Sequence, residues 1–598
     1  MTSFPQGSLE QQQSASDWKR FQIAYFSMEI AVAPEIPTYS GGLGVLAGDT
    51  LRSAADTGLP LLAVTLLHRK GYFRQRLAAD GIQTEEDEPW NPDEALQRLD
   101  PVAVITVQGR PVMVRAWRKD ISGVDGNIVP VIFLDTDLDP NDSWDRHLTD
   151  HLYGGDTYYR LCQEAVLGFG GVRILAALGV QPSVFHMNEG HAALLTLGLL
   201  EEQVNEGDGK GGEGDLLQAT QADIDAVRQR CVFTTHTPVP AGHDRFSLDQ
   251  TRQILGEEKT QALEKFSCCH DGMLNMTYVA LRFSRYVNGV AMQHGRVSQQ
   301  MFPDYDVHAI TNGVHAATWI QPSMQTLLDQ KVPGWRRDNL YLRFAIGIDP
   351  EEIRHRHLEG KRRLIAAVAE RTGTQLHEDR FTIGFARRAA AYKRADMLFT
   401  DPQRLVQIAE EFGGLQIVYA GKAHPQDQLG KAIIHHVFEE AAALNSDLLR
   451  IVYLENYAWE LGAILTGSAD LWLNTPRLPY EASGTSGMKA AMNGIPSLST
   501  LDGWWIEGCI EGATGWAIAE STDEAVEADS LYEKLEHEIL PLYYRHPEKW
   551  SEIMRMALAI NGSFFNTHRM LYQYVTNAYF PGRAPIQLAL QPELLLTR

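Results

Sequence analysis

Short apolar runs of strand length recur along the chain, and each is followed by a loop rich in glycine, polar or charged residues. Segments with helical apolar spacing, such as 192–204, lie between many of them. The strand-like runs are 21–28, 59–68, 183–188, 231–236, 307–311, 381–387, 415–421, 449–456 and 469–475. Strands that alternate with helices predict parallel sheets built from β-α-β units. The pattern therefore predicts an α/β protein.

The parallel strands fall into two groups, which predict two Rossmann-like, doubly wound domains facing each other across a cleft. The stretch 101–137 is β-rich and contains Asp125-Gly126, a candidate hairpin turn, so we interpret it as a β insertion in the first domain. We expect a disordered tail at 1–20, an N-terminal domain at 21–325 and a C-terminal domain at 326–598. The helical segment from about Asp523 could pack back across the first domain. The segment 205–215 has the composition of a flexible surface loop.

Composition and charge exclude several classes of protein. The chain has 598 residues, of which 44% are hydrophobic, and a net charge of −23. Such an acidic balance argues against binding to nucleic acid or to an anionic membrane. Five cysteines form no disulfide framework, and no spacing indicates a metal site. The polar N-terminus lacks an apolar signal core and no apolar run is long enough to cross a bilayer, so we expect a cytoplasmic protein.

Ligands of doubly wound domains bind at the carboxyl ends of the strands, and the informative residues of this chain follow strands. The stretch YSGGLGVLAGD (39–49) precedes a predicted helix. Its glycines would let backbone amides approach an anion closely, or they could form an ordinary tight turn. The stretch FARRAAAYKRAD (385–396) concentrates Arg387, Arg388, Lys393 and Arg394 in an acidic protein. These cations could bind phosphate or form a solvated helix face.

Two further strand ends carry polar residues. Asn188, Glu189 and His191 follow one strand, and His236 follows another. A single histidine at a strand end is more often structural than catalytic, and two such sites in one domain make a structural and a functional role about equally expected. There is no G-x-S-x-G nucleophile elbow.

The stretch EASGTSGMKAAMNG (481–494) contains a single lysine, Lys489. A desolvated lysine amine forms a Schiff base with an aldehyde, and the preceding SGTSG run (483–487) could present hydroxyls and amides to a phosphate. A lysine next to a phosphate cradle is the minimum equipment for pyridoxal phosphate. The alternative is a solvated surface charge.

Taken in order, these motifs resemble those of the α-glucan phosphorylases, the glycogen, maltodextrin and starch phosphorylase family, and of its short bacterial-type members in particular. The segment 481–508 is similar to that family's pyridoxal phosphate segment, an EASGTGNMK-like motif followed by NG and TLDG. The other matches are GGLG (41–44), NGVAMQH (288–294), TNG (311–313), AGKAHP (420–425) and LENY (454–457). They span roughly residues 21–508.

The resemblance implies a GT-B arrangement of the two domains and pyridoxal phosphate held as a Schiff base by Lys489. The implied reaction is reversible, retaining phosphorolysis of an α-1,4-glucan by orthophosphate to α-D-glucose 1-phosphate. Catalytic roles would fall to Lys489, Arg388, Lys393 and His236. Cofactor binding would involve Lys489, Gly484, Thr485, Ser486, Tyr457, Arg387 and Gly42. The substrate would be bound by Gly42, Leu43, His236, Asn312, Glu481, Ser483, Gly484, Glu189 and His191. The resemblance also leaves a homodimer open.

The chain departs from the family pattern at three places. Arg387 stands where lysine is usual, Gly487 stands where asparagine is common, and RRAAAYKR replaces a KRIHEYKR-like segment. Trp319, Trp504 and Trp505 could stack on sugars or lie in a core. The alternative enzyme is a glucan synthase of the same fold that uses a nucleotide sugar, which would not need Lys489. A third alternative is a glucan-binding member without catalytic activity.

Overall fold

The computed structural model describes residues 18, 20–208, 215–239 and 242–580. The predicted tail 1–20 lies outside the described residues except for Trp18 and Arg20, and most of the predicted loop 205–215 also lies outside them. Trp18 is buried and packs against Phe21 with ring centroids 5.9 Å apart.

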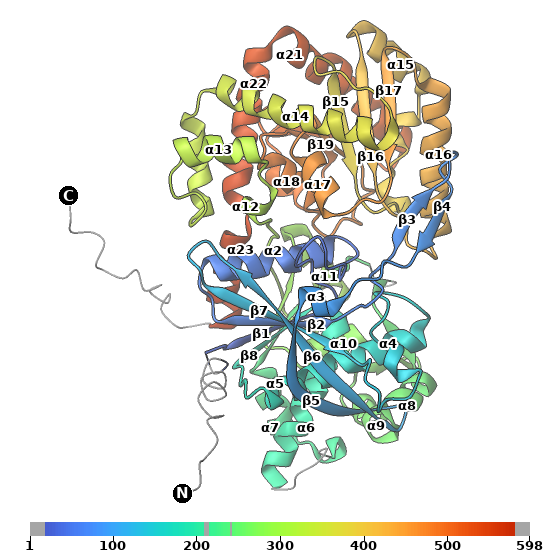
Figure 1. The fold of residues 1–598 in the computed structure, drawn as a ribbon, viewed down its shortest axis with the longest axis vertical. Coiled ribbons are helices and arrows are strands. Elements are labelled where there is room, and N and C mark those ends of the chain that lie inside the picture. Colours follow the sequence, from blue (N-terminus) through green and yellow to red (C-terminus); the bar gives the residue numbers. More distant parts are fainter. Residues whose placement is uncertain (1–17, 19, 209–214, 240–241, 581–598) are drawn as a thin grey trace, which may run out of the picture.

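A nine-stranded sheet forms the lower half of the molecule in Figure 1, and we call this half the first lobe. Its strand order is β14-β13-β9-β8-β1-β2-β7-β6-β5, and all pairs are parallel except β5–β6 and β6–β7. The antiparallel edge comes from the segment interpreted as a β insertion. The strands are β1 (Ile23–Ser27), β2 (Leu61–Leu66), β5 (Gln97–Val107), β6 (Arg110–Ser122), β7 (Ile128–Asp135), β8 (Val184–Asn188), β9 (Cys231–Thr234), β13 (Tyr286–Gly289) and β14 (Val307–Ala309).

A six-stranded, fully parallel sheet forms the upper half, the second lobe. Its order is β17-β16-β15-β18-β19-β20, from strands β15 (Phe381–Ala386), β16 (Leu415–Ala420), β17 (Leu449–Leu454), β18 (Leu471–Asn474), β19 (Ser497–Thr500) and β20 (Gly515–Ile518). Every residue of β15 and β16 is buried, as expected for parallel strands covered on both faces. The predicted α/β fold with parallel sheets is confirmed.

Two small antiparallel sheets complete the β structure. One contains β10 (Arg245–Ser247), β11 (Cys269–His270) and β12 (Met273–Asn275). The other is a hairpin of β3 (Arg74–Leu77) and β4 (Gln83–Glu86), which extends from the first lobe to the second (Figure 1).

Helices surround both large sheets. Those of the first lobe are α2 (Gly42–Asp56), α3 (Pro92–Ala95), α4 (Thr157–Ala165), α5 (Gly171–Ala177), α6 (Leu195–Asp208), α7 (Gln221–Arg228), α8 (Leu248–Leu255), α9 (Glu257–Lys265), α10 (Met276–Arg282) and α11 (Met292–Met301). They are followed by α12 (Ala316–Trp319), α13 (Pro322–Lys331), α14 (Pro350–Thr372), α15 (Pro402–Glu411), α16 (Gln428–Leu444), α17 (Trp459–Thr466), α18 (Ser486–Ala491), α19 (Trp505–Gly508), α20 (Glu524–Lys534), α21 (Leu540–Arg545), α22 (Pro547–Met556) and α23 (Thr567–Gln573). Among the described residues, no helix combines the length and the apolar character needed to cross a membrane.

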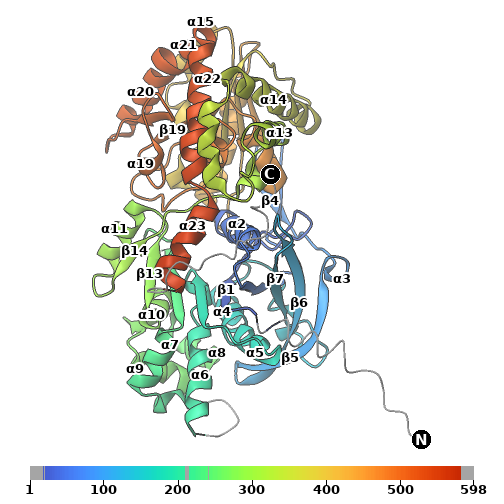
Figure 2. The ribbon, with the colours of Figure 1, turned by 90° about the vertical axis from the view of Figure 1, so that its left-hand side faces the viewer.

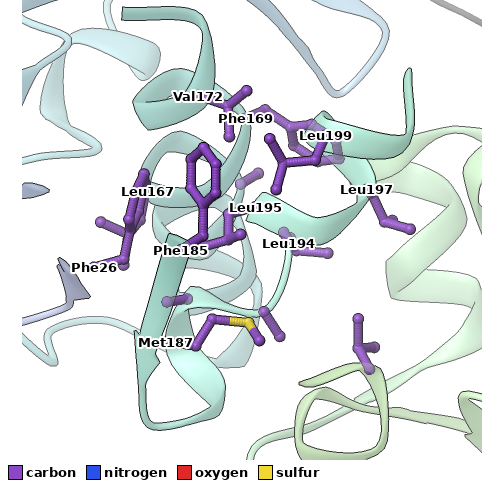
Figure 3. Close-up of a cluster of buried hydrophobic side chains, with 14 of the residues drawn as sticks. Phe26, Leu167, Phe169, Val172, Phe185, Met187, Leu194, Leu195, Leu197 and Leu199 are labelled. Atoms are coloured by element: carbon purple, nitrogen blue, oxygen red, sulfur yellow. The ribbon is translucent and has the colours of Figure 1, made fainter. Parts of the chain in front are cut away.

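Apolar clusters cover both faces of the first-lobe sheet, and one of them lies between the sheet and the helices around α5 and α6. Phe26 of β1 and Phe185 of β8 pack against Leu167 and Phe169 of the helical segment before α5, and against Leu195 of α6 (Figure 3). Burying side chains of this size contributes about 1.5–3 kcal/mol each. A rigid sheet is thereby fixed beneath the loops that follow β8 and β9.

The end of the described chain returns to the first lobe. Helix α23 and the π-helical segment η11 (Tyr574–Tyr579) run down beside β13 and β14, as Figure 2 shows. Tyr579 contributes its hydroxyl to a 2.7 Å hydrogen bond with Nδ1 of His186 in β8, and Met570, Tyr574 and Phe580 belong to the apolar cluster that contains β1 and β2. The last described helices therefore complete the core of the first lobe.

Candidate active site

Lys489 lies on the short helix α18, with only 6% of its surface exposed. Its Nζ atom stands 3.6 Å from the ring centroid of Trp319, which is the geometry of a cation–π contact. The Trp319 indole in turn donates a 2.7 Å hydrogen bond to Oδ2 of Asp49 on helix α2. A lysine of the second lobe and a carboxylate of the first lobe thus contact the same tryptophan.

The environment of Lys489 lowers the pH at which its amine becomes neutral. Burial lowers its pKa to about 8, and the negative charge of Asp49 opposes that shift without cancelling it. No described residue accepts a hydrogen bond from Nζ. A lysine with these properties is a nucleophile at mildly alkaline pH.

The turn before Lys489 is built from small residues for steric reasons. Gly484 has a φ of +74°, a conformation that favours glycine. A Cβ atom on Gly487 would lie 2.7 Å from the Trp504 ring and 3.2 Å from Oγ of Ser497. The asparagine common at position 487 in the resembled family would therefore collide with Trp504, which accounts for this departure.

Two of the predicted phosphate-binding cations are paired with one carboxylate. Arg387 and Lys393 both form short ion pairs with Oε2 of Glu481. Burial alone would raise the pKa of Glu481, but the two positive charges outweigh it and lower the pKa to about 2. Nε and Nη1 of Arg387 are buried and have no partner among the described residues. These guanidinium donors can accept an additional anionic ligand.

The other two cations of this segment differ from each other. Arg388 is exposed and interacts electrostatically with Tyr392, and with Tyr72 and Glu29 of the first lobe. Arg394 is buried and pairs with Glu527 of α20, so it stabilises the second lobe. The four cations of 385–396 therefore do not share one role: Arg394 is structural, whereas the exposed side chain of Arg388 is accessible to a ligand.

The glycine-rich loop of the first lobe begins helix α2. Gly42 is exposed, with no atom within 4 Å of the place that a Cβ atom would take, and Leu43 follows it in the first turn. The amides of Ser40 and Gly41 already donate to Glu29 Oε2, at 2.5 and 3.3 Å. Glu29 therefore occupies the first amides of the loop, and ligand binding by Gly42 and its neighbours stays a prediction.

His236 and Glu189 lie together at the ends of β9 and β8. Nε2 of His236 forms a 2.7 Å hydrogen bond with Oδ1 of Asn188, and burial lowers the His236 pKa to about 4. Glu189 accepts hydrogen bonds from the His236 amide at 2.7 Å and from Thr237 Oγ1 at 3.0 Å. The imidazole is neutral at neutral pH, and Glu189 holds the loop that carries it.

The remaining predicted residues lie around these groups. His191 Nε2 is 3.1 Å from Oδ2 of Asp244, which also pairs with Arg160. The carbonyl of Asn312 accepts a 2.8 Å hydrogen bond from Arg569 of α23, and Oδ1 of Asn312 is buried without a described partner. Tyr457 interacts electrostatically with Arg387.

The contacts connect the predicted residues into three groups. Arg387, Lys393 and Glu481 form one, His236 and Glu189 form another, and Lys489 is the third. No hydrogen bond or ion pair between described residues joins Lys489 to the other two groups.

Sequence reasoning did not identify Asp49 as the carboxylate that faces Lys489. The available signal was an acidic residue in the otherwise small and apolar stretch GVLAGDTL. The sequence leaves Trp319 open as a sugar-stacking residue or a core residue. Its 2% exposure and its contacts with Asp49 and Lys489 make it part of the core.

Comparison with known proteins adds independent information. Residues 242–579 match the model of a family described as carbohydrate phosphorylase. The chain is 35% identical to the maltodextrin phosphorylase of Thermococcus litoralis, over 96% of this chain and 72% of that protein. It is 36% identical to a glycogen phosphorylase of Mycobacterium tuberculosis, over 94% of this chain and 71% of that protein. It is 33% identical to the glycogen phosphorylase of Aquifex aeolicus, over 93% of this chain and 86% of that protein. The chain therefore belongs to the carbohydrate phosphorylase family.

Proposed function

We propose that this protein is an α-1,4-glucan phosphorylase, which uses orthophosphate to release α-D-glucose 1-phosphate from glycogen or maltodextrin, reversibly and with retention. The observation that carries the proposal is the Lys489 amine, which is buried, has no hydrogen bond or ion pair with another described residue and has a pKa lowered to about 8. The names of the relatives support the same activity, and none of those cited is a nucleotide-sugar synthase.

The residues around Lys489 fit pyridoxal 5′-phosphate. The free amine suits covalent attachment of an aldehyde, and Gly484, Thr485 and Ser486 lead directly into helix α18 that carries the lysine. Buried polar atoms without described partners nearby, Oγ of Ser497 among them, are available to a polar ligand. When bound, this cofactor supplies a phosphate group that exchanges a proton with the substrate phosphate.

Arg388 and Lys393 are proposed to bind the substrate phosphate, with the amides around Gly42 facing it from the first lobe, and Arg387 is proposed to bind the cofactor next to it. In the described structure the single negative charge of Glu481 is shared by Arg387 and Lys393, which leaves a net positive charge. The phosphates of substrate and cofactor would compete with Glu481 for Lys393 and Arg387, and the displaced carboxylate would then accept hydrogen bonds from sugar hydroxyls. Two neighbouring phosphates repel each other, so the positive charge of all three side chains lowers the cost of bringing them together.

His236 is proposed to orient the glucosyl unit. Because its pKa is about 4 and Nε2 donates to the Asn188 oxygen, Nδ1 remains free to accept a hydrogen bond from a hydroxyl. Glu189 acts through this loop and not on the sugar, since its carboxylate is occupied by His236, Thr237 and the Gly190 amide. Asn312 Oδ1 and Ser483 are further candidates for sugar contacts.

We propose that the two lobes are the two domains of a GT-B enzyme, approximately residues 21–325 and 326–598. The assignment is supported by the two parallel sheets and by site residues that follow β8, β9, β15, β17 and β18. In doubly wound folds, the carboxyl ends of the strands carry the ligand.

The test begins with the purified protein and its absorbance. We expect a pyridoxal chromophore and glucose 1-phosphate from maltodextrin plus phosphate, and we expect Lys489→Ala to lose both. The matched control is Lys331→Ala, an exposed lysine paired with Glu352. Product from ADP- or UDP-glucose, with none from phosphate and dextrin, would overturn the proposal in favour of a synthase.

A further inference from the structure

The hairpin of β3 and β4 crosses from one lobe to the other, and we call residues 74–86 the clasp. Its antiparallel register runs from Arg74 opposite Glu86 to Leu77 opposite Gln83. A two-stranded hairpin is at best marginally stable alone, so its position depends on what it packs against. Figure 1 shows it beside α16 of the second lobe.

Two glutamines of the clasp are buried and bind backbone groups of the second lobe. Gln83 donates through Nε2 to the Ala423 carbonyl at 2.9 Å and accepts from the Ala423 amide at 3.0 Å. Gln75 donates to the Gly421 carbonyl at 2.8 Å and accepts from the Asn456 amide at 2.9 Å. The two side chains also bond to each other at 2.9 Å. Because Gln75 is fully buried and Gln83 is 4% exposed, each lost contact leaves a buried polar group unsatisfied.

The loops held in this way belong to the candidate active site. Residues 421–425 follow β16 and residues 455–457 follow β17, at the carboxyl ends of the strands. The second loop carries Tyr457, which interacts with Arg387. Further contacts surround the glutamines: Lys422 donates to the Phe73 carbonyl at 2.9 Å, and Glu455 accepts from the Leu77 amide at 2.8 Å.

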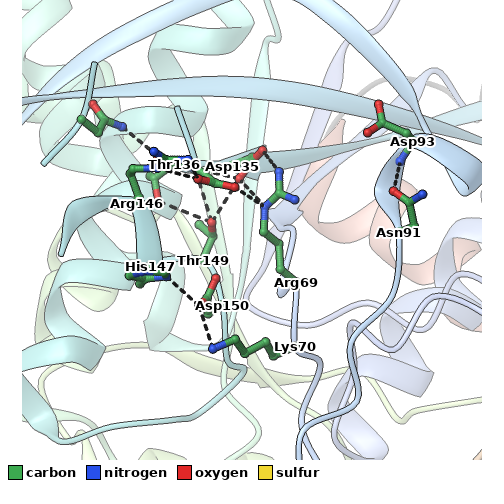
Figure 4. A network of polar contacts seen from close by, with 12 residues as sticks. Arg69, Lys70, Asn91, Asp93, Asp135, Thr136, Arg146, His147, Thr149 and Asp150 are labelled. Atoms are coloured by element: carbon green, nitrogen blue, oxygen red, sulfur yellow. Dashed lines mark hydrogen bonds and ion pairs between the residues drawn. The ribbon is translucent and has the colours of Figure 1, made fainter. Parts of the chain in front are cut away.

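The stem of the clasp is equally well fixed in the first lobe. Arg69 pairs with Asp135 of β7 at 2.6 Å, and Lys70 pairs with Asp150 at 3.3 Å (Figure 4). The carbonyl of Thr149 accepts a 3.0 Å hydrogen bond from the Arg69 amide. Because the first strand of the clasp follows shortly after this anchor, the clasp transmits the position of the first lobe to the loops of the second.

We propose that Gln75 and Gln83 are positioning residues for phosphorolysis: they fix the loops after β16 and β17 so that the phosphate-binding side chains of the second lobe face the Gly42 loop of the first. This inference rests on the proposed function. Arg388 of the second lobe also interacts across the lobes. Its side chain interacts electrostatically with Tyr72, which lies just before the clasp, and with Glu29.

The test uses Gln75→Met, Gln83→Met and the double variant in the full-length, cofactor-loaded protein. Methionine keeps the length of the side chain and removes its hydrogen bonds. The matched control is Glu86→Ala, in the same hairpin, since the Glu86 side chain is 53% exposed and pairs only with Arg76 among the described residues. Gln83→Glu keeps the oxygen that accepts from the Ala423 amide and loses the NH₂ group that donates to the Ala423 carbonyl. We therefore expect its KM for phosphate to lie between those of the wild type and Gln83→Met.

We expect the double variant to raise the KM for phosphate about tenfold, to change the KM for dextrin less than threefold and to keep the pyridoxal absorbance. Amide hydrogen exchange in residues 421–425 and 455–457 should accelerate at least tenfold, with no change in Glu86→Ala. Unchanged hydrogen exchange and unchanged kinetics in the double variant would overturn the inference. A double variant that binds both substrates more weakly to the same extent, loses the pyridoxal absorbance and melts at a lower temperature would also overturn it, because its defect would then be general. If the wild-type protein releases no glucose 1-phosphate from dextrin and phosphate, the proposed function is refuted. The hydrogen-exchange data would in that case still test whether the clasp holds the loops at 421–425 and 455–457.

Discussion

The most direct test of the site is the change Asp49→Asn, which removes one charge next to Lys489 and keeps an oxygen for the Trp319 indole. The lysine Nζ is 3.6 Å from the Trp319 ring centroid, and the Trp319 nitrogen is 2.7 Å from Asp49 Oδ2. Since the indole spans the distance between these contacts, the two charges lie no more than roughly 9 Å apart, and at an effective dielectric constant of about 20 such a pair interacts by about 1.8 kcal/mol.

That energy corresponds to a change of roughly 1.4 in the pKa, at about 1.36 kcal/mol per pKa unit. The wild-type Lys489 pKa is about 8. Because the Asp49 charge stabilises the ammonium, its removal should lower the pKa further, to roughly 6.6. The amine would then react at a lower pH in the variant than in the wild type.

The assay is competitive labelling of the cofactor-free protein with a small amine reagent between pH 5 and 11. Mass spectrometry gives the labelling of Lys489 relative to exposed Lys331. We expect the midpoint of the profile near pH 8 in the wild type and about one to two pH units lower in Asp49→Asn. A wild-type midpoint above pH 10, or the same midpoint in both proteins, would refute this account of the lysine.

Three further predictions concern phosphate, pH and packing. Arg388→Ala should raise the KM for phosphate more than the KM for dextrin, and equal effects on both in steady-state assays would contradict its role. Glu481 has a pKa of about 2 against an ordinary 4.5, so its charge contributes up to about 3 kcal/mol at neutral pH. This contribution is complete above about pH 4.5 and is lost as the pH falls through 2; melting temperatures should therefore show a gap between wild type and Glu481→Gln that narrows below pH 4.5, and a gap independent of pH would argue against it. Gly48→Ala places a Cβ atom 2.1 Å from the Ala31 carbonyl oxygen and should cost about 3 kcal/mol in urea unfolding, whereas Gly347→Ala, which meets no atom within 4 Å, should not.

The parallel sheets and the turn before Lys489 could be predicted from the sequence because each depends on contiguous residues. Buried strands read as continuous apolar runs, and the small residues of the turn precede the lysine directly. The partner of Lys489 could not be predicted in the same way. Asp49 lies on another lobe, and only the complete fold brings it into contact with the tryptophan that Lys489 also contacts.

Polar residues were the main source of missed contacts. Gln75 and Gln83 lie in a hydrophilic stretch that reads as an exposed turn, yet both are buried against backbone groups of distant loops. Arg394 lies close to Arg388 in the sequence, but it is directed into the second lobe to pair with Glu527. A polar side chain is buried only where the fold supplies a hydrogen-bond or ion-pair partner. The spacing of apolar and polar residues along the sequence does not indicate where such a partner lies.

The return of α23 and η11 to the first lobe has a consequence for biosynthesis. Met570, Tyr574 and Tyr579 complete an apolar cluster whose other members include Ile23 and Leu61. The ribosome releases those early strands long before the residues that cover them, so the growing chain must carry exposed apolar surface until those residues have been synthesised. Nascent chains of this protein should accordingly depend on chaperones, and premature termination before Met570 should yield aggregates and not a smaller stable fragment.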